Sequence, residues 1–173
     1  MTNQSNRTAV ITGAGDGIGR ALAINLNSRG IDLYLCDIDR ERLDATAGML
    51  NRDGVTVSTA VVDCGNREQI ETWAKMICAE NDSLDFLFNN AGVGYASPFR
   101  DASLENFEWL MNINYWGVVW STKAFLPLLE ASPAGHLVNI SSIFGMVGIA
   151  TQSAYNSAKF AVRGFTESLQ AEY

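Results

Sequence analysis

The chain has 173 residues, of which 47% are hydrophobic and 18% are charged, and its formal net charge is −7. This apolar content is sufficient for one packed domain and excludes an intrinsically disordered chain. The acidic balance, without any block of basic residues, argues against a nucleic-acid partner.

The cysteines and the N-terminus give further exclusions. Cys36, Cys64 and Cys78 show no Cys-x-x-Cys spacing, so neither a disulfide framework nor a zinc site is predicted. For the single histidine, His136, we expect a structural role rather than metal binding. The opening residues are polar, and no apolar run reaches membrane-spanning length. We therefore expect a cytoplasmic protein with no metal and no membrane partner.

Strand-like and helix-like patterns alternate along the chain. Apolar runs predict strands at 8–12, 32–36, 55–62, 84–88 and 136–141. Helical spacing predicts helices at 17–29, 39–52, 66–80, 103–130 and 152–172, with Ser103 and Gly30 as terminal caps. This alternation is typical of an α/β fold, a doubly wound parallel sheet of the Rossmann type. Right-handed crossovers predict the strand order 3-2-1-4-5 and a ligand site near the carboxyl ends of strands 1 and 4.

A glycine-rich turn, Thr-Gly-Ala-Gly-Asp-Gly-Ile-Gly, follows the first predicted strand at positions 12–19. A turn that opens a helix can present backbone N–H groups to a pyrophosphate. Gly13 and Gly17 permit the close approach of backbone to phosphate, and Gly19 permits tight packing of helix on sheet. The spacing departs from Gly-x-Gly-x-x-Gly, so the turn alone indicates nucleotide binding only weakly.

Asp37 closes the second predicted strand, where an acidic group can accept hydrogen bonds from a ribose diol. The same carboxylate would repel a 2′-phosphate. Asp16 in the glycine turn is also acidic, and Ile38, rather than an arginine, follows Asp37. These charges favour NAD over NADP, and a solvated turn aspartate is the alternative interpretation of Asp37.

Two further strand ends carry polar residues. Asp63 ends the third predicted strand, where its carboxylate could accept a hydrogen bond from the amino group of adenine. The sequence Asn-Asn-Ala-Gly ends the fourth, and its small residues would let a cofactor pass closely. Asn89 and Asn90 could instead tie this loop to neighbouring backbone, so for Asn90 the structural and functional interpretations have equal weight.

The strongest chemical signal is Tyr-Asn-Ser-Ala-Lys, which ends at Lys159, with Ser142 thirteen residues before Tyr155. Positions four apart share a helix face, so the lysine ammonium can lie beside the tyrosine phenol. A nearby cation favours the phenolate, and a serine hydroxyl could hold a substrate oxygen against it. Such groups can move a proton onto or off an alcohol. Ser141 is the rival serine, but the spacing favours Ser142.

In this order, the glycine turn, Asn-Asn-Ala-Gly, Asn114, Ser142 and Tyr-x-x-x-Lys resemble the short-chain dehydrogenase/reductase family in its single-domain TGxxxGxG branch. The resemblance extends from the first strand to Tyr173. It implies that Tyr155 is the general acid/base, that Ser142 positions the carbonyl or alcohol oxygen, and that Lys159 binds the nicotinamide ribose. It also implies that Asn114 holds a water for a proton relay; a kink or a cap in the helix is the alternative role.

The resemblance implies a cofactor and a class of substrate. The predicted NAD-binding residues are Gly13, Asp16, Gly17, Ile18, Gly19, Asp37, Asp63, Asn90, Gly92, Tyr155 and Lys159. The predicted substrate contacts are Tyr95, Phe144 and Gln152. The apolar stretch 142–149 favours an aliphatic, aromatic or lipid-like alcohol or ketone, and a role of its side chains in the core or in an interface is an equal alternative.

The prediction for the chain is an NAD-dependent oxidoreductase that transfers a hydride between nicotinamide and a secondary alcohol or ketone. Residues 1–173 would form one Rossmann-type domain, truncated after its last helix, because the family continues beyond Tyr173 into a substrate lobe. We expect part of a longer enzyme; a catalytically impaired nucleotide-binding or oligomer-forming protein is the alternative. The resemblance also implies that the helix 103–130, apolar on several sides, and the final helix pair with their copies in a homodimer or homotetramer.

Overall fold

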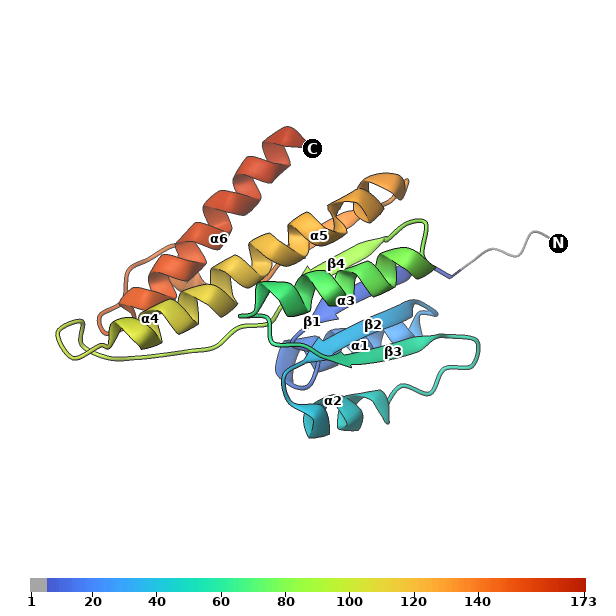
Figure 1. The fold of residues 1–173 in the computed structure, drawn as a ribbon, viewed down its shortest axis with the longest axis horizontal. Helices are drawn as coiled ribbons and strands as arrows, with labels where there is room; N and C mark the ends of the chain where they lie inside the picture. Colours follow the sequence, from blue (N-terminus) through green and yellow to red (C-terminus); the bar gives the residue numbers. More distant parts are fainter. Residues whose placement is uncertain (1–5) are drawn as a thin grey trace.

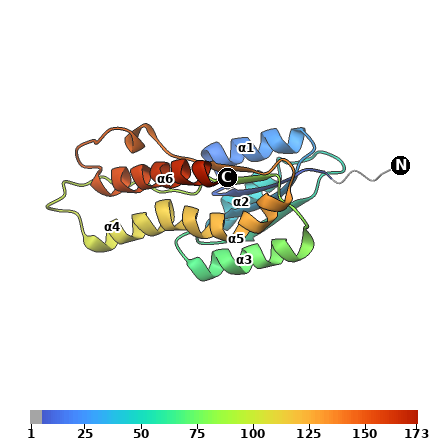
Figure 2. The same cartoon turned by 90° about the horizontal axis from the view of Figure 1, so that it is seen from above.

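The computed structural model describes residues 6–173 as a five-stranded sheet with helices on both faces (Figures 1 and 2). The strands are β1 (Thr8–Thr12), β2 (Asp32–Asp37), β3 (Val57–Val61), β4 (Phe86–Asn89) and β5 (His136–Asn139). The helices are α1 (Gly17–Ser28), α2 (Arg40–Ala47), α3 (Arg67–Glu80), α4 (Leu104–Met111), α5 (Gly117–Ala131) and α6 (Ser153–Glu172), with a π-helical segment η1 (Asn112–Trp116) and a 3₁₀ turn η2 (Ile143–Gly145).

All neighbouring strands are parallel, and their order is β3-β2-β1-β4-β5, which confirms the predicted doubly wound sheet. Side chains alternate between the two faces of a strand, so Val10 of β1 points to one face while Ala9 and Ile11 point to the other. The chain passes from β1 to β2 on one side and from β4 to β5 on the other. The loops that leave β1 and β4 therefore diverge, which opens a site at the carboxyl ends of these strands.

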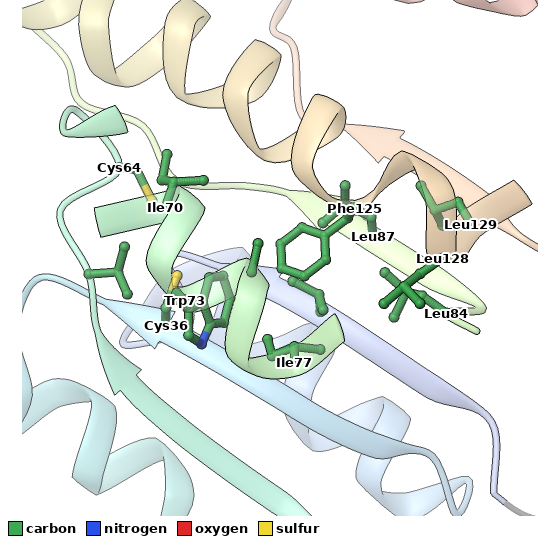
Figure 3. Close-up of a cluster of buried hydrophobic side chains, with 13 residues drawn as sticks. Cys36, Cys64, Ile70, Trp73, Ile77, Leu84, Leu87, Phe125, Leu128 and Leu129 are labelled. Atoms are coloured by element: carbon green, nitrogen blue, oxygen red, sulfur yellow. The ribbon is translucent and has the colours of Figure 1, made fainter. Parts of the chain in front are cut away.

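The core between the sheet and helices α3 and α5 is built around two aromatic side chains (Figure 3). The rings of Trp73 and Phe125 meet edge to face, with centroids 5.7 Å apart. Phe125 is fully buried, and such a side chain contributes about 1.5–3 kcal/mol through burial. Ile77 and Leu87 complete the contact between α3 and β4. This core fixes α5 and, with it, the segment that precedes α5.

The opposite face carries α1 and α2, which pack on β1 and β2 through an aliphatic core. Leu26 of α1 and Leu43 of α2 bury their side chains against Ile11 and Leu33. The end of α1 is closed as predicted by Gly30, which has a φ of 80° and donates its N–H to the carbonyl of Asn27. Figure 2 shows α1 and α3 on opposite sides of the strands.

The helix predicted at 39–52 ends at Ala47, five residues early. Gly48 caps it, and the next residues form tight turns, in which Met49 and Leu50 donate their N–H groups to the carbonyls of Thr46 and Ala47. Glycine has a low helix propensity, and the sequence after it is rich in turn formers, so the apolar spacing alone overestimated the helix.

The long helix predicted at 103–130 starts with Ser103 as its N-cap, as expected, but it is interrupted in the middle. In η1 the N–H of Gly117 bonds to the carbonyl of Asn112, five residues back, instead of four. Gly117 also lies so close to the carbonyl of Cys64 that a Cβ on it would be 2.6 Å from that oxygen. The π-helical turn therefore lies where the helix backbone meets the backbone of Cys64 closely. Such turns are frequent at functional sites.

Among residues 6–173, no helix is both long enough and apolar enough to cross a bilayer. The location of the protein in the cell stays a prediction. Within the same range, no group of three or more His, Cys, Asp or Glu side chains is arranged to hold a metal ion. The three cysteines are free thiols; Cys36 and Cys64 are buried, and Cys78 is exposed.

Candidate active site

A cleft of about 1080 Å³ runs across the carboxyl ends of the strands, at the divergence between β1 and β4. Loops after all five strands contribute to it, together with the start of α6. The predicted site residues that line it are Gly13, Asp16, Gly17, Ile18, Asp37, Asp63, Asn90, Gly92, Ser142, Phe144, Gln152, Tyr155 and Lys159. The lining does not include Gly19, Tyr95 or Asn114.

The glycine turn at one end of the cleft depends on the absence of side chains. Gly13 and Gly17 have φ values of 65° and 52°, a region that other residues rarely adopt. A Cβ on Gly19 would lie 2.1 Å from the Gly13 carbonyl oxygen and 2.6 Å from the side-chain nitrogen of Asn90. Gly19 thus lies behind the cleft and lets α1 approach the turn. The turn leaves backbone N–H groups at the start of α1, where an anion is stabilised.

Asp16 caps α1 at the edge of the cleft. Its carboxylate accepts a hydrogen bond from the N–H of Gly17 at 2.7 Å. The same carboxylate lies 3.7 Å from the guanidinium of Arg20 and 3.6 Å from that of Arg42. Ile18, beside it, is largely exposed at the cleft. The negative charge of Asp16 is therefore balanced locally by two arginines.

Asp37 both shapes the glycine turn and faces the cleft. One oxygen accepts the N–H of Gly15 at 2.8 Å, and the other accepts the N–H of Asp39 at 3.0 Å. A carboxylate has about four acceptor positions, so two backbone donors leave capacity for a ligand. A Cβ on Gly15 would lie 2.8 Å from the Asp37 carboxyl carbon, which explains the glycine at that position.

Arg42 is a cleft residue that the sequence interpretation missed. Its guanidinium lies 3.2 Å from the carboxylate of Asp39 and 3.6 Å from that of Asp16. Exposed pairs of this kind contribute only about 0–1 kcal/mol, so the guanidinium is weakly held. Its position in the first turn of the helix after Asp37 was the available signal, because that turn starts at the carboxyl end of β2.

Asp63 and Asn90 each line the cleft while holding a loop in shape. The carboxylate of Asp63 accepts the N–H of Gly65 at 2.8 Å. The side-chain amide of Asn90 donates to the carbonyls of Thr12 and Gly13 at 3.0 and 2.9 Å. Asn90 thereby ties the loop after β4 to the glycine turn, as the structural interpretation expects. Because Asn90 also lines the cleft, a contact with a cofactor stays a prediction.

Asn114 is fully buried in η1 and reaches the loop after β4. Its side-chain oxygen accepts the N–H of Val93 at 2.7 Å, and its side-chain nitrogen donates to the Val93 carbonyl at 2.8 Å. A Cβ on Gly92 would lie 3.2 Å from the Asn114 oxygen and 3.6 Å from the Nζ of Lys159. The Asn114 amide therefore holds the backbone that borders Lys159. This contact agrees with the alternative interpretation, in which Asn114 has a structural role at an irregular point of the helix.

Lys159 is 96% buried at the other end of the cleft, with 4% of its surface exposed. Its Nζ donates a hydrogen bond to the carbonyl of Ile140 at 2.8 Å and lies 5.7 Å from the centre of the Tyr155 ring. Burial lowers the pKa of the Lys159 ammonium from 10.5 to about 8. At neutral pH the charged form still predominates, so a cation lies beside the phenol.

The two candidate serines have different hydrogen bonds. The hydroxyl of Ser141 donates to the carbonyl of Lys159 at 3.1 Å. The hydroxyl oxygen of Ser142 accepts the N–H of Phe144 at 3.2 Å and caps η2, which leaves its O–H available as a donor. The ring of Phe144 meets that of Tyr155 edge to face at 5.9 Å. This arrangement favours Ser142 as the serine that can donate a hydrogen bond to a ligand.

The remaining predicted substrate residues lie in different places. Tyr95 packs outside the cleft lining against Leu110 and Ala154, and a hydrogen bond with Asn106 lowers the pKa of Tyr95 from its usual 10.0. Gln152 precedes α6 and lines the cleft, and its side chain makes no capping hydrogen bond to the helix. Of these two residues, only Gln152 lines the cleft.

A family model described as short chain dehydrogenase matches residues 7–173. The chain belongs to the short-chain dehydrogenase family. Among relatives in this family, it is 43% identical over 172 residues to the protein SadH of Mycobacterium tuberculosis, covering 99% of the chain and 62% of SadH. It is 40% identical over 163 residues to estradiol 17-beta-dehydrogenase 11 of Homo sapiens, covering 94% of the chain and 54% of that protein.

A solved short-chain dehydrogenase/reductase from Burkholderia phymatum, in complex with NAD, matches the chain with a TM-score of 0.91 and 33% identity. The match covers 100% of the chain and 62% of that structure. Another similar structure, of a metagenomic short-chain oxidoreductase, contains NADP. A nicotinamide nucleotide is thus common to these family members, with either form of the cofactor. The chain spans less than two thirds of the length of the relatives SadH and estradiol 17-beta-dehydrogenase 11.

Proposed function

We propose that this member of the family is an NAD-dependent dehydrogenase or reductase of apolar secondary alcohols and ketones, with Tyr155 as general acid/base. One observation carries the proposal. A single cleft has the glycine turn and Asp37 at one end and Ser142, Tyr155 and Lys159 at the other. An extended dinucleotide bound along it would have its two ends in these two groups of residues.

The residues of the cleft fit a nicotinamide dinucleotide. Gly13 and Gly17 leave room that a Cβ would restrict, and the start of α1 favours a pyrophosphate. The free acceptor positions of Asp37 suit a ribose diol. We propose that Asp63 binds the adenine end and that Lys159 binds the ribose next to the nicotinamide. When bound, the nicotinamide would supply or accept the hydride.

The protein groups at the other end would move the proton. Tyr155 would donate the proton to a substrate oxygen or remove it, and the O–H of Ser142 would hold that oxygen in place. The ammonium of Lys159, fixed by the Ile140 carbonyl, would stabilise negative charge on the phenol. Positioned acid–base groups of this kind typically accelerate a reaction by about 10²–10⁴-fold.

The proposed preference for NAD rests on the charges around Asp37. Of the described residues that line this end of the cleft, Asp16, Asp37 and Asp39 carry negative charge and Arg42 alone carries positive charge. The guanidinium of Arg42 lies 3.2 Å from the carboxylate of Asp39 and 3.6 Å from that of Asp16, so the net charge of these residues is negative and disfavours a 2′-phosphate. Asp37 would repel that phosphate directly.

An apolar substrate is proposed from the loop that borders the catalytic end. Met146, Val147 and Ile149 expose large parts of their side chains, at 59, 47 and 42%. Phe144 of the same loop lines the cleft, and exposed apolar side chains beside a cleft favour an apolar ligand. The relative named for estradiol, an apolar secondary alcohol, supports the same class.

The test measures turnover of a panel of apolar secondary alcohols by the unsubstituted chain and by Asp37→Asn, with NAD and with NADP. We expect turnover with NAD in the unsubstituted chain. Asp37→Asn should weaken NAD binding by about 10- to 10²-fold, because hydrogen bonds to a charged group contribute about 1.5–3 kcal/mol. It should also raise the preference for NADP. Asp53→Asn, in an exposed turn, is the control. No turnover with either cofactor would refute the proposed function.

We also propose that the chain forms a homodimer or homotetramer through the outer faces of α4, η1 and α6. Leu104, Trp116 and Phe160 expose 70, 44 and 44% of their surfaces there. Exposed apolar side chains of this size mark contact surfaces. Light scattering coupled to gel filtration should give a mass of two or four chains, and the mass of one chain would contradict the proposal.

A further inference from the structure

Asn156 is a buried amide next to Tyr155, and the interpretation of the sequence gave it no role. It exposes 8% of its surface. Its side-chain nitrogen donates to the carbonyl of Phe144 at 2.6 Å and to that of Val147 at 2.7 Å. Its side-chain oxygen accepts the N–H of Ile149 at 3.0 Å. One side chain thus binds three backbone groups of the same loop.

These three groups belong to the apolar loop, residues 143–149, that follows Ser142. The carbonyls of Phe144 and Val147 and the N–H of Ile149 are not paired with other backbone groups of residues 6–173. The Asn156 amide supplies the hydrogen bonds that a neighbouring strand would otherwise provide. The loop has a second contact with α6 at Gly145, where a Cβ would lie 2.7 Å from the carbonyl of Lys159. Asn156 and this glycine contact together hold the apolar loop against the helix that carries Tyr155.

The contact bears on Ser142, which lines the cleft, and on the exposed apolar side chains of the adjoining loop. Ser142 caps the turn that contains Phe144, so its hydroxyl moves with that turn. The exposed side chains of Met146, Val147 and Ile149 extend from the part of the loop that the amide binds. A shift of the loop would therefore displace both the serine and the apolar surface relative to the phenol.

We propose that Asn156 is a positioning residue that sets the distance of the apolar loop from Tyr155 and thereby selects substrates by size. The proposal rests on the proposed function of the cleft. An asparagine suits this role because it offers two donors to two carbonyls and one acceptor to an N–H. An aspartate of the same shape would keep the acceptor and place a negative oxygen against both carbonyls.

The experiment compares Asn156→Asp with Asn81→Asp. Asn81 also donates to a backbone carbonyl, that of Ile77 at 2.8 Å, and to the hydroxyl of Tyr34 at 2.8 Å, at the far end of α3. For each protein, kcat and KM are measured with isopropanol, cyclohexanol and menthol, together with NADH affinity by fluorescence and stability in urea. These readouts separate loop position from a general loss of stability.

We expect Asn156→Asp to change the ratio of kcat/KM between menthol and isopropanol by about 10-fold or more, because small displacements near reacting atoms cost up to about 10²-fold. NADH affinity should stay at the unsubstituted value, since the glycine turn is not touched. Asn81→Asp should lose stability but keep the substrate ratio. If Asn156→Asp does not fold, Asn156→Ser, which is smaller and uncharged, should show the same change in ratio.

Equal substrate ratios in the unsubstituted chain and the folded Asn156 variant would overturn the inference about Asn156 and leave the proposed function standing. A change of the same size in Asn81→Asp would also overturn it, since the effect would then follow from stability. An unsubstituted chain that turns over none of the alcohols would overturn the proposed function and this inference with it.

Discussion

Replacement of Tyr155 by phenylalanine should lower turnover by about 10²–10⁴-fold while leaving NADH affinity close to that of the unsubstituted chain. The substitution removes the O–H that would move the proton. It keeps the ring, which packs edge to face on Phe144 at 5.9 Å and lies 5.7 Å from the Nζ of Lys159. The loss should therefore appear in kcat and not in cofactor binding or in stability.

The measurement is steady-state turnover with NAD and an alcohol, beside NADH binding followed by fluorescence. Tyr34→Phe is the matched control, because the Tyr34 hydroxyl bonds to the side chain of Asn81, away from the cleft. It removes a phenol hydroxyl of the same kind and should leave turnover unchanged. Full turnover in Tyr155→Phe would show that another group transfers the proton.

Replacement of Gly19 by alanine should both destabilise the fold and abolish nucleotide binding. The new methyl group would lie 2.1 Å from the carbonyl oxygen of Gly13 and 2.6 Å from the side-chain nitrogen of Asn90. Neither neighbour can move freely, because one is backbone and the other holds the loop after β4. Overpacking of this kind costs about 1–3 kcal/mol, and relieving it would displace the turn that receives the pyrophosphate.

The control for Gly19→Ala is Gly164→Ala in α6, where a Cβ would meet nothing within 4 Å. Alanine in an exposed helix position is favoured over glycine by about 0.8–1.0 kcal/mol, so this substitution should raise stability. The two alanines should therefore have opposite effects on the free energy of unfolding in urea, and only Gly19→Ala should weaken NADH binding. A Gly19→Ala protein with unchanged stability and NADH affinity would contradict the packing seen around the turn.

Much of the fold could be predicted because it depends on local patterns. The alternation of apolar strands and amphipathic helices was sufficient to predict the strand order, since crossover handedness leaves few arrangements. Ser103 and Gly30 were predictable as helix caps because a cap is decided by the few residues around it. The end of α2 at Ala47 was not, because the apolar spacing continued past the glycine that stops the helix.

The residues of the candidate site divide in the same way. The glycine turn, Asp37 and the Tyr155–Lys159 pair were visible as motifs, because each chemical role needs a particular residue type at a particular spacing. Asn156 was not visible, because an asparagine is common on any helix, and for Arg42 the only signal was its position in the first helical turn after Asp37. Their roles arise from the neighbours that the fold brings to them, two carboxylates for Arg42 and three backbone groups of one loop for Asn156.

By itself, the sequence determined a parallel α/β sheet, its family and the two groups of residues at the strand ends, because these follow from periodicity and short motifs. Only the tertiary structure decided that the long helix turns into a π-helix at Asn114, that this amide clamps Val93, and that the lysine is buried enough to lose much of its basicity. Those features depend on which backbone groups lie beside a side chain and on how much water remains around it, and a linear pattern contains neither.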